Sequence, residues 1–288
     1  MSKIGIVILN YNDYRETKEY VDKIKGYRLL SEIVIVDNNS TDSSYENLKR
    51  MEKKNVTVLK TDENKGYAYG NNVGIKFLED RVDYIIISNP DVVVDESAIR
   101  KLKNDLDENP DISIIAPIVN QNGQLLKGRR LPKIIDEIGL NLNYFHRKVE
   151  KNLGYDEKRY NSELTKVDVV SGCFFMARRE DLNLVGNFDD STFLFYEENI
   201  LATKLRNINN KTYVDNGVVV LHNESVTINK TMASIRKYKI LKDSQKYFVK
   251  YYLHANAFEM FALRFVYRIS LMIAYIIYYI NKVFEKKK

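Results

Sequence analysis

The chain has little of what builds disulfide-stabilised, fibrous or low-complexity proteins. Its 288 residues include one cysteine, four prolines and twelve glycines. The lone Cys173 excludes a disulfide scaffold and a cysteine-rich zinc site, and the scarcity of proline and glycine excludes collagen-like and low-complexity sequence. Because 44% of the residues are hydrophobic and 29% are charged, the composition predicts a folded chain with a packed core.

Targeting and membrane-spanning patterns are also missing from the sequence. A strand-like apolar run begins at Ile4, without the basic-then-apolar layout of a signal peptide. The longest uncharged stretch of the apolar C-terminal region, residues 269–281, has 13 residues, fewer than the roughly 20 that a helix needs to cross a bilayer. We therefore expect a cytoplasmic protein.

The excess of basic over acidic residues lies in the C-terminal part of the chain. The formal net charge is +6 and the pI is about 9.0, values that alone would suggest a polyanion such as nucleic acid as partner. However, residues 236–288 hold 12 Lys and Arg against 3 Asp and Glu, whereas the rest of the chain holds 33 against 36. A mildly acidic body with a basic, aromatic tail does not suit general polyanion binding, so we expect no nucleic-acid partner.

Apolar strand-like runs alternate with helical patterns through the first ninety or so residues. Strands are predicted at 4–9, 33–36, 56–59 and 84–88, and helices at 15–25, 43–53 and up to about residue 79. This alternation predicts an α/β fold with a parallel sheet flanked by helices. Further strands are predicted at 112–119, 167–177 and 218–221, and residues 128–162 form a long basic and aromatic excursion between them.

Polar side chains follow three of the predicted strands. They are Asn10–Asn12, Asp37–Asn39 and Asn89–Asp91. Because open parallel sheets bind ligands beyond the carboxyl ends of their strands, these clusters predict a binding site at that edge.

Asp91 and His222 each end a predicted strand. Taken singly, an Asp after a proline is more often a turn former, and a lone His is more often a structural residue. Since both side chains would reach one edge of the sheet, they also suit Mn²⁺ or Mg²⁺ bound chiefly through phosphates.

Two other segments can be interpreted either as functional sites or as ordinary structural features. The Gly- and Asn-rich segment 64–74 is neither a P-loop nor a Rossmann glycine motif. Phosphates could still bind at the start of the following helix, with Lys65 nearby. The segment is equally compatible with a plain loop that caps the helix. Glu197 and Glu198 follow an aromatic cluster, which suits a general base near neutral pH. A solvated acidic pair at a helix start is the alternative.

Taken in order, the motifs resemble the family-2 inverting glycosyltransferases of the GT-A fold, especially the bacterial rhamnosyltransferase-like members. The likeness covers roughly residues 3–252. It rests on the segments 6–12, 33–42, 64–74, 89–91, 171–178, 185–189 and 193–198, on His222 with Ser225, and on 246–252.

This resemblance implies a GT-A domain at residues 1–252, a single Rossmann-like domain with a mostly parallel central sheet, and a C-terminal helical appendage at 253–288. It also implies transfer of a sugar from a UDP- or dTDP-sugar donor to a glycan or lipid-linked acceptor, in the biosynthesis of cell-surface polysaccharide such as capsule. A catalytically silent nucleotide-sugar-binding scaffold subunit is the alternative, and a nucleotidyltransferase is a third reading.

The resemblance also assigns roles to single residues. Glu198 would be the catalytic base, with Glu197 beside it. Asp91 and His222 would hold the Mn²⁺ or Mg²⁺ ion. The donor nucleotide and sugar would be bound by Asn10, Tyr11, Asp37, Asn39, Asp42, Lys65, Gly66, Asn72 and Asn89.

Three positions depart from the family pattern. Asn89 replaces the first acid of the metal motif, Glu198 replaces the usual Asp, and Ile200 stands where many relatives have another acid. These departures motivate the reading as a silent scaffold subunit.

The tail predicts an amphipathic helix over residues 258–284. Its apolar side would carry Phe261, Phe265, Ile269, Ile273, Ile276, Ile280 and Phe284, and its other side Arg264, Arg268, Tyr275, Tyr278 and Lys282. This pattern indicates a helix lying in the interface of an anionic membrane, on the inner face of the cell membrane, with Lys286–Lys288 near the lipid headgroups. Packing on the body or on a second subunit of a homodimer is the alternative.

Overall fold

The computed structural model describes residues 2–209, 211–223 and 232–285. Within them the chain forms two compact units. The first comprises Met1–Arg130, Tyr155–Phe193 and Glu197–Ser225, and the second comprises Leu131–Gly154, Leu194–Tyr196 and Val226–Lys288. These bounds differ from the division expected after residue 252, which stays a prediction.

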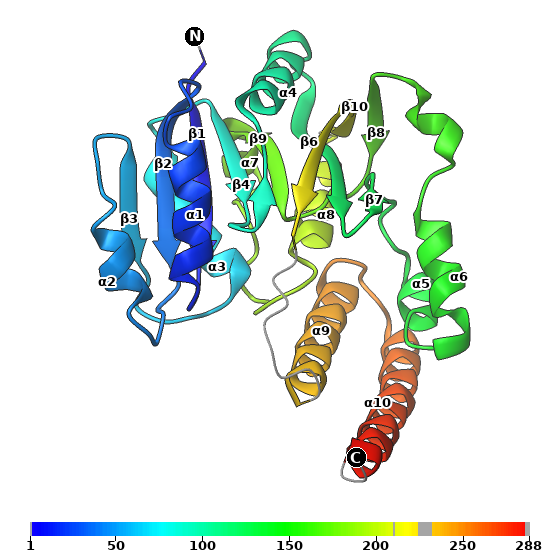
Figure 1. The fold of residues 1–288 in the computed structure, drawn as a ribbon. Helices are drawn as coiled ribbons and strands as arrows, with labels where there is room; N and C mark the ends of the chain where they lie inside the picture. Colours follow the sequence, from blue (N-terminus) through cyan, green and yellow to red (C-terminus); the bar gives the residue numbers. More distant parts are fainter. Residues whose placement is uncertain (1, 210, 224–231, 286–288) are drawn as a thin grey trace. The chain divides into compact units, whose positions relative to one another are not determined.

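The first unit is built on a ten-stranded sheet with the main order β3-β2-β1-β4-β9-β6-β10-β5, with β7 on β6 and β8 on β10 (Figure 1). The strands are β1 (Ile4–Asn10), β2 (Leu30–Asp37), β3 (Val56–Lys60), β4 (Tyr84–Ser88), β5 (Val92–Val93), β6 (Ile112–Gln121), β7 (Gln124–Leu126), β8 (Leu164–Val167), β9 (Phe174–Arg178) and β10 (Lys211–His222).

Helices cover both faces of this sheet because its central strands are apolar on both sides. Along β1, Ile6 and Ile8 enter one hydrophobic cluster, while Val7 between them enters the other. The first cluster includes residues of α1 (Tyr14–Ile24), α2 (Ser44–Lys49) and α4 (Glu96–Glu108), and the second includes residues of α3 (Tyr67–Leu78), α7 (Arg179–Leu184) and α8 (Glu197–Asn207). The predicted α/β class with a flanked central sheet is confirmed.

The parallel half of the sheet follows the prediction, whereas the other half is mixed. β3, β2, β1 and β4 pair in parallel, but β9 runs antiparallel between β4 and β6. The single strand predicted at 167–177 is wrong: β8 pairs with β10, and β9 lies elsewhere in the sheet. Between these two strands, the N–H of Gly172 donates to Glu198 and its carbonyl accepts from Tyr67.

The helix predicted at 43–53 is also shorter than expected, since α2 ends at Lys49. Lys53 and Val56 instead exchange backbone hydrogen bonds of 3.1 and 3.2 Å, which turn the chain into β3.

The second unit is helical. It contains α5 (Ile134–Gly139), α6 (Asn143–Leu153), α9 (Met232–Tyr251) and α10 (Ala257–Glu285), so the excursion predicted at 128–162 supplies two of its helices. The 3₁₀ turn η1 (Glu157–Asn161) belongs to the first unit. Among the described residues, no helix is long and apolar enough to span a membrane.

Candidate active site

Asp37, at the carboxyl end of β2, organises the neighbouring strand ends. Its carboxylate accepts hydrogen bonds from Asn10 Nδ2 at 2.8 Å, from Ser40 Oγ at 2.6 Å and from Ser40 N–H at 3.0 Å. Asp37 is 0% exposed and Asn10 is 1% exposed, so both stabilise the strand ends from the protein interior. Tyr11 beside them is 47% exposed. Tyr11 is therefore the side chain at this edge that a ligand can cover.

The loops after β1 and β2 are joined across this edge. Thr41 N–H donates to Asn12 Oδ1 at 2.8 Å, and Asn39 takes a left-handed backbone conformation with φ 57°. Asp42 is exposed and caps the start of α2 by accepting from Ser44 N–H at 2.9 Å. Asn39 and Asp42 thus lie in the loop that follows the buried Asp37.

Gly66 marks the closest approach between the loop before α3 and the segment before α8. Its φ is 105°, and a Cβ atom there would lie 1.9 Å from the carbonyl oxygen of Phe193. Tyr67 N–H donates to that same carbonyl at 2.9 Å. Asn38 supports the loop through Nδ2, which donates to Asn64 Oδ1 and to the carbonyl of Gly66, both at 3.0 Å. Only glycine fits this backbone and this spacing.

The two remaining predicted residues of this region differ in their surroundings. Lys65 is exposed and forms an ion pair with Glu63 at 2.6 Å. The amide of Asn72 donates to the carbonyl of Phe188 at 3.0 Å and accepts from Phe188 N–H at 3.1 Å. Asn72 therefore ties α3 to the segment after α7, while Lys65 is open to a ligand.

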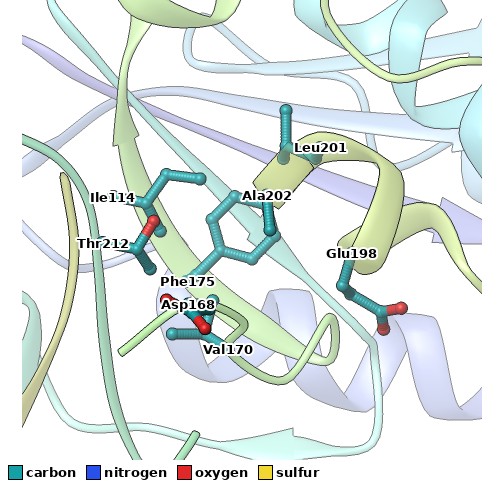
Figure 2. A pocket seen from close by; sticks show the side chains of 8 residues that line it. All are labelled: Ile114, Asp168, Val170, Phe175, Glu198, Leu201, Ala202 and Thr212. Carbon is teal, nitrogen blue, oxygen red and sulfur yellow. The ribbon is translucent and has the colours of Figure 1, made fainter. Parts of the chain in front are cut away.

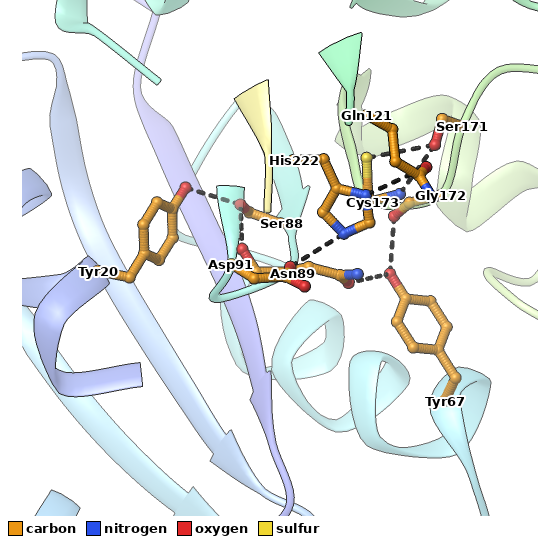
Figure 3. A network of polar contacts seen from close by, with 10 residues as sticks. All are labelled: Tyr20, Tyr67, Ser88, Asn89, Asp91, Gln121, Ser171, Gly172, Cys173 and His222. Carbon is orange, nitrogen blue, oxygen red and sulfur yellow. Dashed lines mark hydrogen bonds and ion pairs between the residues drawn. The ribbon is translucent and has the colours of Figure 1, made fainter. Parts of the chain in front are cut away.

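Asp91 and His222 lie together, as the sequence predicted (Figure 3). Asp91 Oδ1 is 3.1 Å from His222 Nε2, and the two side chains are 14% and 10% exposed. The cause is strand pairing: β5 runs antiparallel to β10 with His222 opposite Val92, the residue after Asp91. His222 Nδ1 lies 3.4 Å from Gln121 Oε1, which orients the ring. Ser225, predicted to follow this histidine in the motif, lies outside the described residues.

These two side chains fit a divalent cation whose other ligands are phosphate oxygens or water. A carboxylate oxygen and an imidazole nitrogen face one another at hydrogen-bonding distance, and both are ligands that Mn²⁺ accepts. The described part of the chain holds no cluster of three or more His, Cys, Asp or Glu that would form an all-protein metal cage.

Glu198 lies in the first turn of α8 and is linked to the end of β4 through Tyr67. Its Oε1 accepts from Gly172 N–H at 3.2 Å, and the carbonyl of Gly172 accepts from Tyr67 OH at 2.8 Å. The same hydroxyl is 3.4 Å from Asn89 Oδ1 (Figure 3). A Cβ atom at position 172 would lie 2.3 Å from Glu198 Oε1, so the carboxylate packs directly on the glycine.

Two pKa values show that the acidic side chains share one environment. Burial raises the pKa of Tyr67 well above its usual value, and the negative charges of Glu198 and Glu197 raise it further. Burial likewise raises the pKa of the Cys173 thiol to about 11, with Asp91 and Glu198 adding to the shift, although a hydrogen bond from Ser171 opposes it. Asp91 and Glu198 therefore both lie close enough to act on one thiol.

A small cavity lies behind α8 in the first unit, with Glu198 at its border (Figure 2). Its volume is about 10 Å³, which is room for a single water molecule and not for a sugar. The lining residues are Ile114, Asp168, Val170, Phe175, Glu198, Leu201, Ala202 and Thr212.

Sequence reasoning gave no individual role to four residues that complete the site. They are Asn38, Tyr67, Gln121 and Gly172. Asn38, Tyr67 and Gly172 stand inside or directly beside the motifs already recognised, but nothing in a single sequence shows which neighbour of a motif points inward. Gln121 ends β6, which pairs in parallel with β10, and this pairing explains its place beside His222.

The sequence of this chain is similar to those of known glycosyltransferases. The family model for glycosyl transferase family 2 matches residues 5–186. A low-salt glycan biosynthesis hexosyltransferase of Haloferax volcanii is 26% identical over 243 residues, which are 83% of this chain and 73% of that protein. An N-acetylglucosaminyl-diphospho-decaprenol L-rhamnosyltransferase of Mycobacterium tuberculosis is 25% identical over 186 residues, 60% of each chain.

Solved structures show the same fold at low sequence identity. A mannosyltransferase from Pyrobaculum calidifontis, solved with GDP-Man and Mn²⁺, has a TM-score of 0.60 at 17% identity and covers 95% of this chain and 74% of its own. TarS 1–349 of S. aureus, solved with UDP-GlcNAc, has a TM-score of 0.59 at 14% identity and covers 91% and 70%. These likenesses confirm the GT-A fold class expected from the sequence.

Proposed function

Because the chain belongs to glycosyl transferase family 2, we propose that it is an inverting enzyme that moves a sugar from a UDP- or dTDP-sugar to a glycan or lipid-linked acceptor. The family assignment from the sequence motifs is confirmed, and with it a glycosyltransferase role in glycan biosynthesis. The observation that carries the proposal is that Asp91 pairs with His222, while Glu198 is linked through Gly172 and Tyr67 to Asn89, two residues before Asp91. Such a site unites a leaving-group stabiliser with a base.

The donor's diphosphate belongs beside Asp91 and His222. A divalent cation held by this pair, Mn²⁺ or Mg²⁺, would supply positive charge to the departing nucleoside diphosphate. Gln121 orients His222, and the pairing of β5 with β10 fixes the spacing of the two side chains. The structures solved with Mn²⁺ for the Pyrobaculum mannosyltransferase and for GalNAc-T7 support this proposal.

The nucleotide would extend from the diphosphate along the strand ends to Tyr11. Tyr11 offers an exposed ring for contact with the nucleobase of the donor. The buried side chains of Asp37 and Asn10 hold the loop that carries Tyr11. The rim of the donor site is proposed to include Asn39, Asp42, Lys65, Gly66, Asn72 and Asn89.

Glu198 is proposed to take the proton from the acceptor hydroxyl. As the acceptor oxygen forms its bond to the anomeric carbon, the bond from that carbon to the diphosphate oxygen breaks, and the nucleoside diphosphate leaves from the opposite face. Glu198 lies in the first turn of α8. The N–H of Gly172 holds the carboxylate in place, and the neighbouring Glu197 is buried in the same turn.

The decisive experiment is Glu198→Gln in the full-length protein, supplied with Mn²⁺ and a panel of nucleotide sugars. Because the amide keeps the shape but cannot accept the proton, transfer should fall about 10²–10⁴-fold while donor binding by calorimetry persists. Undiminished transfer would overturn the assignment of the base. A wild-type protein that binds donor without turnover would favour the scaffold alternative, and release of pyrophosphate would favour a nucleotidyltransferase.

We also propose that α10 docks on an anionic membrane surface. Its exposed large apolar side chains recur at helical spacing and are Phe258, Phe261, Phe265, Ile269, Met272 and Ile276. Arg264 and Arg268 are exposed beside them, where they can reach lipid phosphates, whereas Met260 and Leu263 are buried. Lys286–Lys288 lie outside the described residues, as do the side chains predicted at 278, 280, 282 and 284.

A further inference from the structure

The chain leaves the first compact unit for three residues directly before Glu197 and Glu198. Leu194–Tyr196 belong to the second unit, whereas Phe193 and Glu197 belong to the first. Phe195 and Tyr196 have φ values of 74° and 73°. Two successive bulky residues in the left-handed region are unfavourable, and such a conformation persists only where its surroundings hold it. The segment 194–196 must therefore be held by specific contacts.

Those contacts come from α5 and α9. Tyr196 OH donates to Glu137 Oε2 at 2.6 Å, and Ser244 Oγ donates to the carbonyl of Leu194 at 2.7 Å. The ring of Tyr196 packs against Phe248 with centroids 5.4 Å apart. One end of the segment is thus fixed through its backbone and the other through its side chain.

Glu137 is itself fixed in a buried polar network. It is 0% exposed, and Gln245 Nε2 donates to its Oε2 at 2.6 Å and to its backbone carbonyl at 3.0 Å. Gln245 Oε1 in turn accepts from Asn141 at 3.0 Å and from Lys242 at 3.3 Å. Burial lowers the pKa of Lys242 to about 8, although the charge of Glu137 opposes that shift. A buried network with several linked hydrogen bonds makes a rigid support.

We propose that Glu137 and Ser244 are positioning residues for sugar transfer. By holding the segment 194–196 with Phe195 and Tyr196 in the left-handed conformation, they determine the direction in which the chain enters α8 and therefore where the carboxylate of Glu198 lies. The proposal rests on the function proposed above for Glu198. Only Glu197 separates Tyr196 from Glu198, so relaxation of φ at Tyr196 would displace the base. A misplacement of about 1 Å costs about 10²-fold in rate.

Tyr196→Phe tests the proposal in the full-length protein, with Tyr238→Phe as the matched control. Tyr238 also loses a part-buried hydroxyl contact in the second unit, but the partner of that hydroxyl is Ser270 of α10 and not a residue of the 194–196 segment. Tyr196→Phe should lower kcat about 10- to 100-fold with less than a twofold change in donor KM, and should speed amide hydrogen exchange at residues 197–200. Tyr238→Phe should change neither. Glu137→Gln keeps an oxygen that accepts from Tyr196, so it should retain more activity than Glu137→Ala.

The result that would overturn the proposal is a kcat for Tyr196→Phe within twofold of that of Tyr238→Phe. Equal hydrogen exchange at residues 197–200 in the two variants would overturn it as well. A wild-type protein that transfers no sugar would contradict the proposed function instead, and hydrogen exchange would still decide whether the 194–196 segment sets the start of α8.

Discussion

Gly172 leaves just enough room for the carboxylate of Glu198. A methyl group at this position would lie 2.3 Å from Oε1 and 2.9 Å from Cδ, so Gly172→Ala must push the carboxylate aside. Since the first turn of α8 stays in place, we expect kcat to fall about 10²-fold while the donor dissociation constant is unchanged. Steady-state kinetics together with calorimetry of donor binding measures both quantities.

Gly26→Ala provides the control for this substitution. A Cβ atom at Gly26 meets nothing within 4 Å, so this variant should keep the wild-type kcat. If Gly172→Ala transferred sugar as fast as Gly26→Ala, the carboxylate of Glu198 would not need its observed position, and its role as base would be refuted.

Asp105 is predicted to make stability depend on pH. It lies with Asp215 around the amine of Lys101, and burial followed by the proximity of Asp215 raises the pKa of Asp105 to about 6. The folded state then binds a proton between pH 4 and 6 that the unfolded state does not bind. This contribution to the free energy of unfolding is therefore largest at low pH and is lost as the pH rises through 6.

The substitution Asp105→Asn removes this titration. Relative to the wild type, the variant should gain about 2 kcal/mol of stability between pH 4.5 and pH 7, because roughly 1.4 pKa units of the shift take effect in this range and each unit corresponds to about 1.4 kcal/mol. Urea unfolding at both pH values measures the difference. A constant difference between the two proteins at both pH values would contradict the pKa assigned to Asp105.

Among the helices and strands, those that depend on a local pattern of apolar and polar residues could be predicted from the sequence. The apolar runs of β1, β2 and β4 and the polar residues that end them were recognised, because a strand buried on both faces has few alternatives. The sequence also predicted that Asp91 and His222 lie at one edge of the sheet. They meet because the two-residue strand β5 pairs antiparallel with β10, and such a pairing between distant segments has no local sequence pattern. The separation of β8 from β9 is likewise a matter of long-range pairing, because β8 pairs with β10 and β9 pairs with β4.

The left-handed Phe195 and Tyr196 mark the limit of such prediction. Neither residue type favours positive φ, so contacts such as those with Glu137, Ser244 and Phe248 are needed to hold this conformation. Those partners lie about 50 residues or more away in the chain, and no periodic pattern points to them. By contrast, the apolar spacing of α10 was predicted from the sequence, since an amphipathic helix is a local pattern.

The exposed apolar side of α10 leads to a prediction about membrane binding. In the full-length protein, Phe261→Asp combined with Phe265→Asp places two charges among exposed apolar side chains, which opposes burial in the lipid interface. Co-sedimentation with phosphatidylglycerol vesicles should fall at least tenfold. Replacing Arg264 and Arg268 by Gln should weaken binding to these vesicles but leave binding to neutral phosphatidylcholine vesicles unchanged.

Ile135→Asp is the matched control, because Ile135 is also a strongly exposed apolar residue of the second unit but lies on α5. Its binding to vesicles should equal that of the wild type. Two results together would show that α10 instead binds a second copy of the chain. The wild type would not co-sediment with vesicles, and light scattering would show a dimer that the Phe261→Asp/Phe265→Asp variant does not form.

At the scale of the whole molecule, a cation bound by Asp91 and His222 would join distant parts of the chain. One ligand follows β4 and the other ends β10, so donor and cation bound together would add to the free energy of unfolding by linkage. At a donor concentration 100-fold above Kd, this gain is about 2.7 kcal/mol, which raises Tm by roughly 5–10 °C.

Thermal unfolding of the full-length protein tests this coupling directly. The donor should raise Tm in the presence of Mn²⁺, and chelation with EDTA should abolish most of the increase. His222→Ala should behave like the chelated wild type, because Asp91 alone leaves the cation with a single protein ligand. His146→Ala should respond as the wild type does, since His146 is exposed on α6, where it pairs with Glu150. An equal Tm increase with and without EDTA would contradict the proposed metal site.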